Sequence, residues 1–231
     1  MSVALLYTLL LAGGLWHALG IFQQAMQVLA APMIAALGLF LFFDSLLAFR
    51  ASESRRNPQD RSAQQASTLS AHKFVLWTLL VFLGGFFVEW VGVKSGAIFG
   101  SYVYSATLQP AIGGVPIAIG FAWFNMTMSA AAVSQRLVPA RYADSPPGMA
   151  LVIALAMVVF DFLMEPAAEQ LNYWSWREGI VPIRNYFAWF VCGYFFSYVG
   201  LRLGLLVRPL SPIAVHAYVA QLFYFAMVNL F

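Results

Sequence analysis

Residues 29–49 read LAAPMIAALGLFLFFDSLLAF, and this stretch decides the class of fold. Asp44 is its single charged residue, and its length matches the roughly 20 apolar residues that a helix needs to cross the hydrocarbon core of a bilayer. Further stretches of the same character lie near residues 3–22, 73–92, 116–135, 148–165, 184–206 and 212–231. The sequence therefore predicts an all-α fold, a polytopic helical membrane bundle of about seven transmembrane helices that forms one domain over residues 1–231.

The composition of the whole chain agrees with this class. Hydrophobic residues make up 62% of the chain and charged residues 9%, against about 25% charged residues in a soluble domain. These values exclude a water-soluble globule, a disordered chain and a DNA-binding module, and we expect no nucleic-acid partner. One cysteine, Cys192, excludes an intrachain disulfide, and the three histidines lie far apart, so we expect no metal site.

The basic residues predict the orientation in the membrane. Nine of the twelve fall in alternate connections, which share one side: Arg50, Arg55, Arg56, Arg61, Lys73, Arg136, Arg141, Arg202 and Arg208. The other side has Lys94, Arg177 and Arg184. Because cytoplasmic loops carry the excess of Lys and Arg, the N-terminus is expected in the cytoplasm and the C-terminus outside. A bacterial inner (plasma) membrane is the expected location.

Three connections have distinct characters. The segment 51–72 is polar and rich in Ser, Gln and Ala, so we expect a cytoplasmic linker. Residues 93–115 are rich in Gly and aromatic residues, and we expect them to pack back into the mouth of the bundle. Residues 166–183 contain Trp174 and Trp176, which suit a membrane interface.

Ionisable residues within spans are candidates for function, because their burial in lipid is costly. Glu89 lies at the outer end of the third span, and Asp161 and Glu165 lie at the outer end of the fifth. Arg184 and Asn185 open the sixth span on the same side. Asp161 and Glu165 are four residues apart and share a helix face. Such a pair must hold a proton, bind a metal or pair with a cation.

Purely structural roles remain open for these acids. Arg184 is an alternative ion-pair partner for Asp161, and Lys94 for Glu89. The spacing Asp161-x-x-x-Glu165 is also a poor site for a metal-bound diphosphate, because the chain has no aspartate-rich repeat.

Several segments between residues 85 and 200 resemble a known family. They are Phe99-Gly-Ser-Tyr-Val-Tyr104, Gly113-Gly-Val-Pro116, Ala122-Trp-Phe124, Phe160-Asp-Phe-Leu-Met-Glu-Pro166, Tyr173-Trp-Ser-Trp176 and Pro182-Ile-Arg-Asn-Tyr-Phe-Ala-Trp189. Their order is similar to that in the membrane carotenoid-biosynthesis hydratases, of the bisanhydrobacterioruberin hydratase and gamma-carotene 1'-hydratase type. Arg184 stands where the family pattern leads us to expect an uncharged amide residue.

The resemblance implies a hydro-lyase that adds water across the terminal isopropylidene double bond of a linear carotenoid, giving a tertiary alcohol. Asp161 is then the expected proton donor, and Glu165 or Glu89 positions water and stabilises charge. Asn185, Tyr102 and Tyr104 support that network, and Trp123 and Arg184 join the substrate-binding residues. No cofactor is expected, because hydration is redox-neutral.

Two other functions remain open. One is a non-catalytic subunit that binds carotenoid or lipid, and the other is a small transporter, against which the absence of an inverted repeat argues. The expected partners are a linear carotenoid and membrane lipid. A second copy of the chain or other carotenoid enzymes are further partners that the sequence leaves open.

Overall fold

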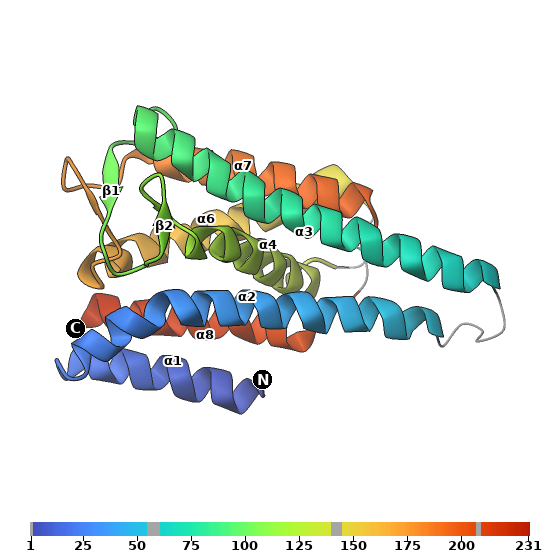
Figure 1. The fold of residues 1–231 in the computed structure, drawn as a ribbon, viewed down its shortest axis with the longest axis horizontal. Helices are drawn as coiled ribbons and strands as arrows, with labels where there is room; N and C mark the ends of the chain where they lie inside the picture. The colour runs from blue at the N-terminus through green and yellow to red at the C-terminus, as the bar shows by residue number, and fades with distance from the viewer. Residues whose placement is uncertain (1, 55–60, 140–144, 207–208) are drawn as a thin grey trace.

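The computed structural model describes residues 2–54, 61–139, 145–206 and 209–231. In these ranges seven helices run back and forth along one long axis (Figure 1). They are α1 (Val3–Ala18), α2 (Gln23–Ser54), α3 (Arg61–Ser95), α4 (Ala118–Leu137), α6 (Pro146–Gln170), α7 (Ile183–Arg202) and α8 (Pro212–Leu230). The predicted all-α membrane fold is therefore confirmed.

Four of the described helices are long and apolar enough to cross a membrane: Gln23–Arg50 of α2, Leu69–Ser95 of α3, α6 and α8. α1 is apolar but shorter. α4 and α7 each have 20 residues and pack within the same bundle. The C-terminus lies at one end of the long axis and the N-terminus lies near its middle, because the shorter α1 spans only part of the length of the bundle (Figure 1).

The expected linker at 51–72 is helical over most of its length. α2 continues to Ser54, past the apolar part that ends at Arg50, and α3 begins at Arg61, before the apolar part that starts at Leu69. Residues 55–60 lie outside the described residues. The linker prediction relied on polarity, but Ala, Gln and Arg are good helix formers, and they allow an apolar helix to continue past the membrane.

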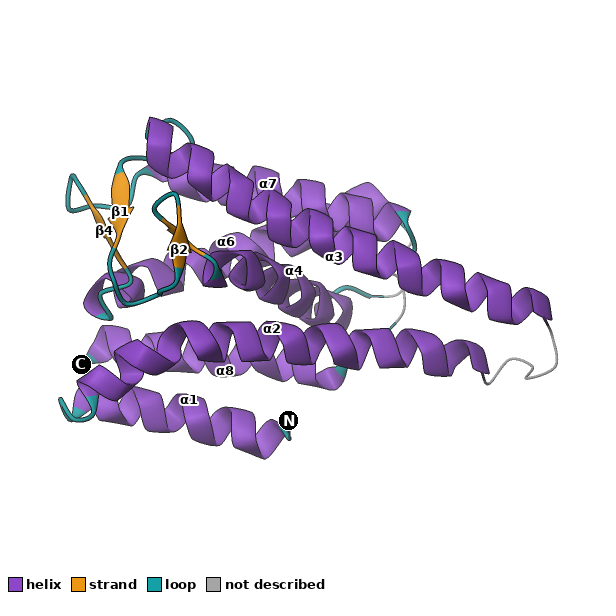
Figure 2. Cartoon of the chain, in the orientation of Figure 1, coloured by secondary structure: helices purple, strands orange, loops and turns teal. Residues whose placement is uncertain are grey.

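Two short antiparallel ribbons cover one end of the bundle (Figure 2). β1 (Tyr102–Tyr104) pairs with β4 (Trp174–Trp176), and β2 (Ala111–Ile112) pairs with β3 (Val115–Pro116). The sequence did not predict these strands. It did predict that residues 93–115 fold back onto the bundle, and the burial of Phe99, Leu108 and Val115 confirms this.

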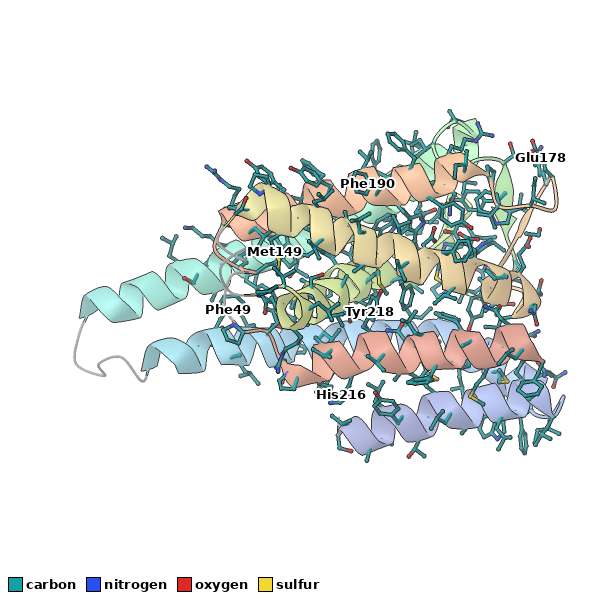
Figure 3. The ribbon with its side chains drawn as sticks, turned by 180° about the vertical axis from the view of Figure 1, so that it is seen from behind. Phe49, Met149, Glu178, Phe190, His216 and Tyr218 are labelled. Atoms are coloured by element: carbon teal, nitrogen blue, oxygen red, sulfur yellow. The ribbon has the colours of Figure 1, made fainter. Side chains whose placement is uncertain are left out.

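α4 is the central helix of the bundle. It packs against α2, α3, α6 and α8, and most of its residues are buried. Small residues such as Ala130 and Ala131 allow these close approaches. On the outside of the bundle, Leu and Phe side chains stand exposed, as expected for a surface in contact with lipid. Figure 3 shows Phe190 pointing outward from α7, whereas the hydroxyl of Tyr218 on α8 donates to the carbonyl of Ala156 at 2.7 Å.

Candidate active site

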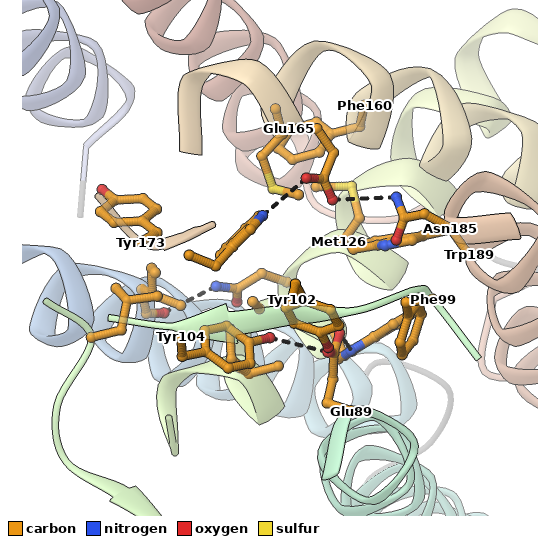
Figure 4. A pocket seen from close by; sticks show the side chains of 18 of the residues that line it. Glu89, Phe99, Tyr102, Tyr104, Met126, Phe160, Glu165, Tyr173, Asn185 and Trp189 are labelled. Carbon is orange, nitrogen blue, oxygen red and sulfur yellow. Dashed lines mark hydrogen bonds between the residues drawn. The ribbon is translucent and has the colours of Figure 1, made fainter. Parts of the chain in front are cut away.

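A cavity of about 90 Å³ lies beneath the β1–β4 ribbon. Six helices (α2, α3, α4, α6, α7 and α8) and both strands of the ribbon contribute residues to its walls. Figure 4 shows the cavity from close by. Aromatic and aliphatic side chains make up most of the lining. The carboxyl and amide side chains on its walls are those of Glu89, Glu165, Asn125, Asn185 and Gln221.

Glu89 enters the cavity from α3 and is 5% exposed. The hydroxyls of Tyr102 and Tyr104 both donate to its Oε2, the latter at 3.0 Å. The indole N–H of Trp123, on α4, donates to Oε1 at 3.2 Å. Three donors from two different elements therefore hold this buried carboxyl group in one orientation.

The two tyrosines on β1 remain hydroxyl donors over a wide pH range. Burial raises the pKa of Tyr102 above its ordinary value, and the neighbouring Glu89 raises it further. The same two causes raise the pKa of Tyr104. Both phenols therefore stay protonated at neutral pH and keep donating to Glu89.

Glu165 enters from α6 and is 3% exposed. The indole N–H groups of Trp174 and Trp176 both donate to its Oε2, each at 2.9 Å. The amide nitrogen of Asn185 donates to its Oε1 at 3.2 Å. Figure 4 shows Glu165 and Asn185 on one side of the cavity and Glu89 on the other.

Asp161 lies one helical turn from Glu165 and is completely buried. Its Oδ2 accepts a hydrogen bond from the amide of Asn185 at 2.7 Å, and its Oδ1 meets no described N–H or O–H donor. One amide nitrogen, that of Asn185, contacts both Oδ2 of Asp161 and Oε1 of Glu165, so the two buried carboxyl groups lie side by side. Two carboxyl groups so close together in a buried site do not both ionise readily, and we treat the pair as a single unit that holds a proton.

The β1–β4 ribbon connects the two carboxyl groups that line the cavity. Alternate residues of a strand point to the same face, so Tyr102 and Tyr104 face inward from β1 and Trp174 and Trp176 face inward from β4. Tyr102 lies opposite Trp176, and Tyr104 lies opposite Trp174. One face of a ribbon of three residue pairs thus provides two donors to Glu89 and two to Glu165.

The structure brings most of the predicted site residues together. Glu89, Glu165, Tyr102, Tyr104, Trp123 and Asn185 all line the cavity. Asp161 contacts Asn185, which also contacts Glu165, but Asp161 is not on the cavity wall. As the expected proton donor, Asp161 should meet the substrate directly. In the structure it is instead packed between α6 and α7, behind Glu165.

The position of Arg184 does not match the substrate-binding role expected for it. Its side chain is exposed and does not line the cavity, although its neighbour Asn185 is buried in the site. The unusual residue in the family pattern therefore faces away from the cavity. Lys94 is also exposed, so neither basic residue takes the ion-pair role that the sequence left open.

Several site residues were not predicted. The sequence predicts an interfacial role for Trp174 and Trp176, and it gives no signal that assigns Trp189, Asn125, Gln221 or Phe225 to the site. Trp189 stacks on Trp123 with ring centroids 4.3 Å apart. The Trp-x-Trp spacing was the available signal, because alternation places both indoles on one face of a strand.

The cavity places carboxyl groups on two opposing walls, with aromatic faces between them. In the described ranges, His, Cys, Asp and Glu side chains do not gather in groups of three or more that could hold a metal ion. The chemistry that the carboxyl groups support directly is the movement of protons to and from a molecule bound between them.

Fold and site together define a helical membrane protein with a buried cavity lined by carboxyl and aromatic side chains. Residues 61–231 match the family described as carotenoid biosynthesis protein, and the chain belongs to this family. The matched range includes the whole ribbon, all the carboxyl groups of the site and every cavity element except α2. Membership supports a carotenoid-modifying function.

One curated relative is the bisanhydrobacterioruberin hydratase of Haloarcula japonica, which is 27% identical over 110 residues. The aligned part is 46% of this chain and 37% of that protein, so the match spans little more than a third of the relative's length. No solved structure matches the chain.

Proposed function

We propose that this protein is a carotenoid hydratase that adds water across the terminal isopropylidene double bond of a linear carotenoid. The observation that carries the proposal is the pair of opposing carboxyl walls, Glu165 on α6 and Glu89 on α3, in one aromatic cavity. Acid-catalysed hydration needs a proton donor on one side of the double bond and a base beside the attacking water. The name of the Haloarcula relative supports the same reaction.

In the first step the Asp161–Glu165 pair supplies a proton. Glu165 is the member on the cavity wall, so it transfers the proton to the alkene carbon that bears hydrogen. The alkene π electrons form the new C–H bond, and positive charge develops on the carbon that bears two methyl groups. Asp161, which lies beside Glu165 on the shared amide of Asn185, shares the proton with it before transfer.

In the second step water attacks the tertiary cation from the side of Glu89. An oxygen lone pair forms the C–O bond, and Glu89 accepts the proton that the water loses. Tyr102, Tyr104 and Trp123 hold Glu89 in position for this role. The product is a tertiary alcohol, and the site is reset when Glu89 releases the proton it accepted and one proton returns to the Asp161–Glu165 pair.

Aromatic faces stabilise the cation between the two steps. Trp123 and Trp189 are stacked with an interplanar angle of 20° on the cavity wall. The negative face of an aromatic ring attracts a cation within about 6 Å, by about 0.5–2 kcal/mol according to how far the site excludes water. Such faces stabilise the cation without forming a bond to it.

The size of the cavity fits the end of a chain together with water. One water molecule takes about 10–15 Å³ by the same measure of volume, so 90 Å³ accommodates a small apolar end group beside the attacking water. The adjoining part of the polyene would contact apolar side chains of the lining such as Met126, Phe160 and Phe225.

A carotenoid-binding subunit without catalytic activity is the second candidate, because the aromatic lining would retain a pigment even without proton transfer. Both candidates predict that pigment is retained, but only the first predicts a new product.

Expression in cells that make lycopene or gamma-carotene separates the two. We expect a new pigment that is more polar and heavier by one water, seen by chromatography and mass spectrometry. The Glu165→Gln variant, expressed to the same level, should retain the pigment but leave it unhydrated. Unchanged pigment with well-expressed wild-type protein would support the binding subunit instead.

A further inference from the structure

The indole pair of β4 has a hydrogen-bonding arrangement that the proposed reaction does not yet explain. Trp174 and Trp176 both direct their N–H groups to the same oxygen, Oε2 of Glu165, each at 2.9 Å. An indole N–H can only donate. Two such donors on one oxygen therefore keep Oε2 as an acceptor, so any proton that Glu165 carries must reside on Oε1.

Oε1 is the oxygen on the side of Asp161, because the amide nitrogen of Asn185 contacts both Oε1 of Glu165 and Oδ2 of Asp161. The transferable proton thus lies on the part of Glu165 that meets its partner carboxyl group. The opposite oxygen, Oε2, is the one on which the indoles converge.

We propose that Trp174 and Trp176 are positioning residues that stabilise the carboxylate formed when Glu165 gives its proton to the alkene. This inference rests on the proposed hydration. As the proton leaves, negative charge develops on Glu165, and preoriented N–H donors bind a developing charge more strongly than a neutral acid. The two hydrogen bonds therefore favour the transition state over the ground state, which increases kcat rather than substrate affinity.

The local structure holds the donors in place before reaction. The backbone N–H of Trp176 donates to Oε1 of Glu169, one turn beyond Glu165 on α6, at 3.0 Å. The backbone N–H of Arg177 donates to the carbonyl of Ser101 at 2.9 Å, and that of Ser105 donates to the carbonyl of Tyr173 at 3.0 Å. These bonds fix both ends of β4 against β1 and α6, so little reorganisation is needed when the charge appears.

The test removes each N–H donor and keeps an aromatic ring at its position. In Trp174→Phe and Trp176→Phe, kcat should fall about 10–100-fold for each donor lost, with KM changed less than about threefold. Benzothienylalanine at position 176, which replaces the indole N–H by sulfur in a ring of the same shape, should give the same loss as Trp176→Phe. Trp90→Phe, on a half-exposed residue outside the cavity lining, is the matched control and should keep wild-type kcat.

The solvent deuterium isotope effect on kcat separates charge stabilisation from a structural role. It should increase in both variants, because proton transfer becomes more strongly rate-limiting. A double variant with kcat within about twofold of wild type would overturn the inference, as would a loss confined to KM with an unchanged isotope effect. If the wild-type protein itself hydrates no carotenoid, the proposed function is wrong, and this inference is wrong as well. That result is seen in the wild type, whereas failure of the inference alone is seen only in the variants.

Discussion

At the scale of single residues, the three acids of the site differ in the number of hydrogen-bond donors that they contact. Glu89 and Glu165 each accept three side-chain hydrogen bonds and line the cavity. Asp161 accepts one from Asn185 and lies behind Glu165. This difference predicts unequal effects of removing each acid, because only a carboxyl group on the cavity wall meets the alkene directly.

Glu165→Gln should reduce the hydration rate by about 10²–10⁴-fold, the range typical for loss of a general acid. Asp161→Asn should cause a smaller loss, because Glu165 remains on the wall and loses only the group with which it shares its proton. The measurement is the initial rate of product formation by purified protein. Glu178→Gln, in the exposed loop after β4, serves as the control. Equal losses in the two site variants, or a larger loss in Asp161→Asn, would indicate that Asp161 and not Glu165 donates the proton to the alkene.

At the scale of elements, the β1–β4 ribbon depends on a glycine at its base. Gly100 has φ +126°, a conformation that residues with a side chain rarely adopt. A Cβ atom there would lie 2.6 Å from Cγ of Pro182 and 3.0 Å from Cζ3 of Trp176. The close approach of the chain at Gly100 therefore allows Trp176 to lie against β1 and reach Glu165.

Gly100→Ala should destabilise the protein by about 1–3 kcal/mol through backbone strain and should also displace Trp176, so turnover should fall with stability. Gly179→Ala is the matched control, because Gly179 has φ +69° but a Cβ atom there would meet no other atom within 4 Å. It should share the strain and keep turnover. Thermal unfolding in detergent and the rate of hydration measure the two effects. Equal turnover in both variants would argue against the contact with Trp176.

The sequence predicts the helices, but it does not predict the ribbon. Hydropathy places the helices, because burial in lipid demands about 20 apolar residues whatever the neighbours. The pairing of Tyr102 with Trp176 joins strands of three residues that are far apart in the chain, and it depends on contacts that no local pattern encodes. The contrast between Arg184 and Asn185 has a similar cause: successive helical residues differ by about 100° in direction, and only the packing of α7 decides which one faces the cavity.

At the scale of the whole molecule, the cavity is lined by the β1–β4 ribbon, and Figure 1 shows β1, β2 and the C-terminus at the same end of the bundle. The distribution of basic residues predicts that this end faces outward and that the opposite end, where α2 ends and α3 begins, faces the cytoplasm. The proposed reaction would then take its water from the outer side of the membrane.

Cysteine labelling in a Cys192→Ala background tests this orientation. A thiol reagent that cannot cross the membrane should label Ser175→Cys in intact cells, because Ser175 is exposed on β4. Ser62→Cys should be labelled only after the cells are permeabilised. The reverse pattern would place the cavity at the cytoplasmic side and overturn the charge-based topology.

The most direct test of the central claim is the source of the oxygen in the product. Purified protein is incubated with a linear carotenoid in H₂¹⁸O under an atmosphere free of O₂, and the product is examined by mass spectrometry. Hydration predicts an alcohol in which the new hydroxyl carries ¹⁸O, formed without O₂. Product that forms only when O₂ is admitted, with oxygen derived from that gas, would contradict the account.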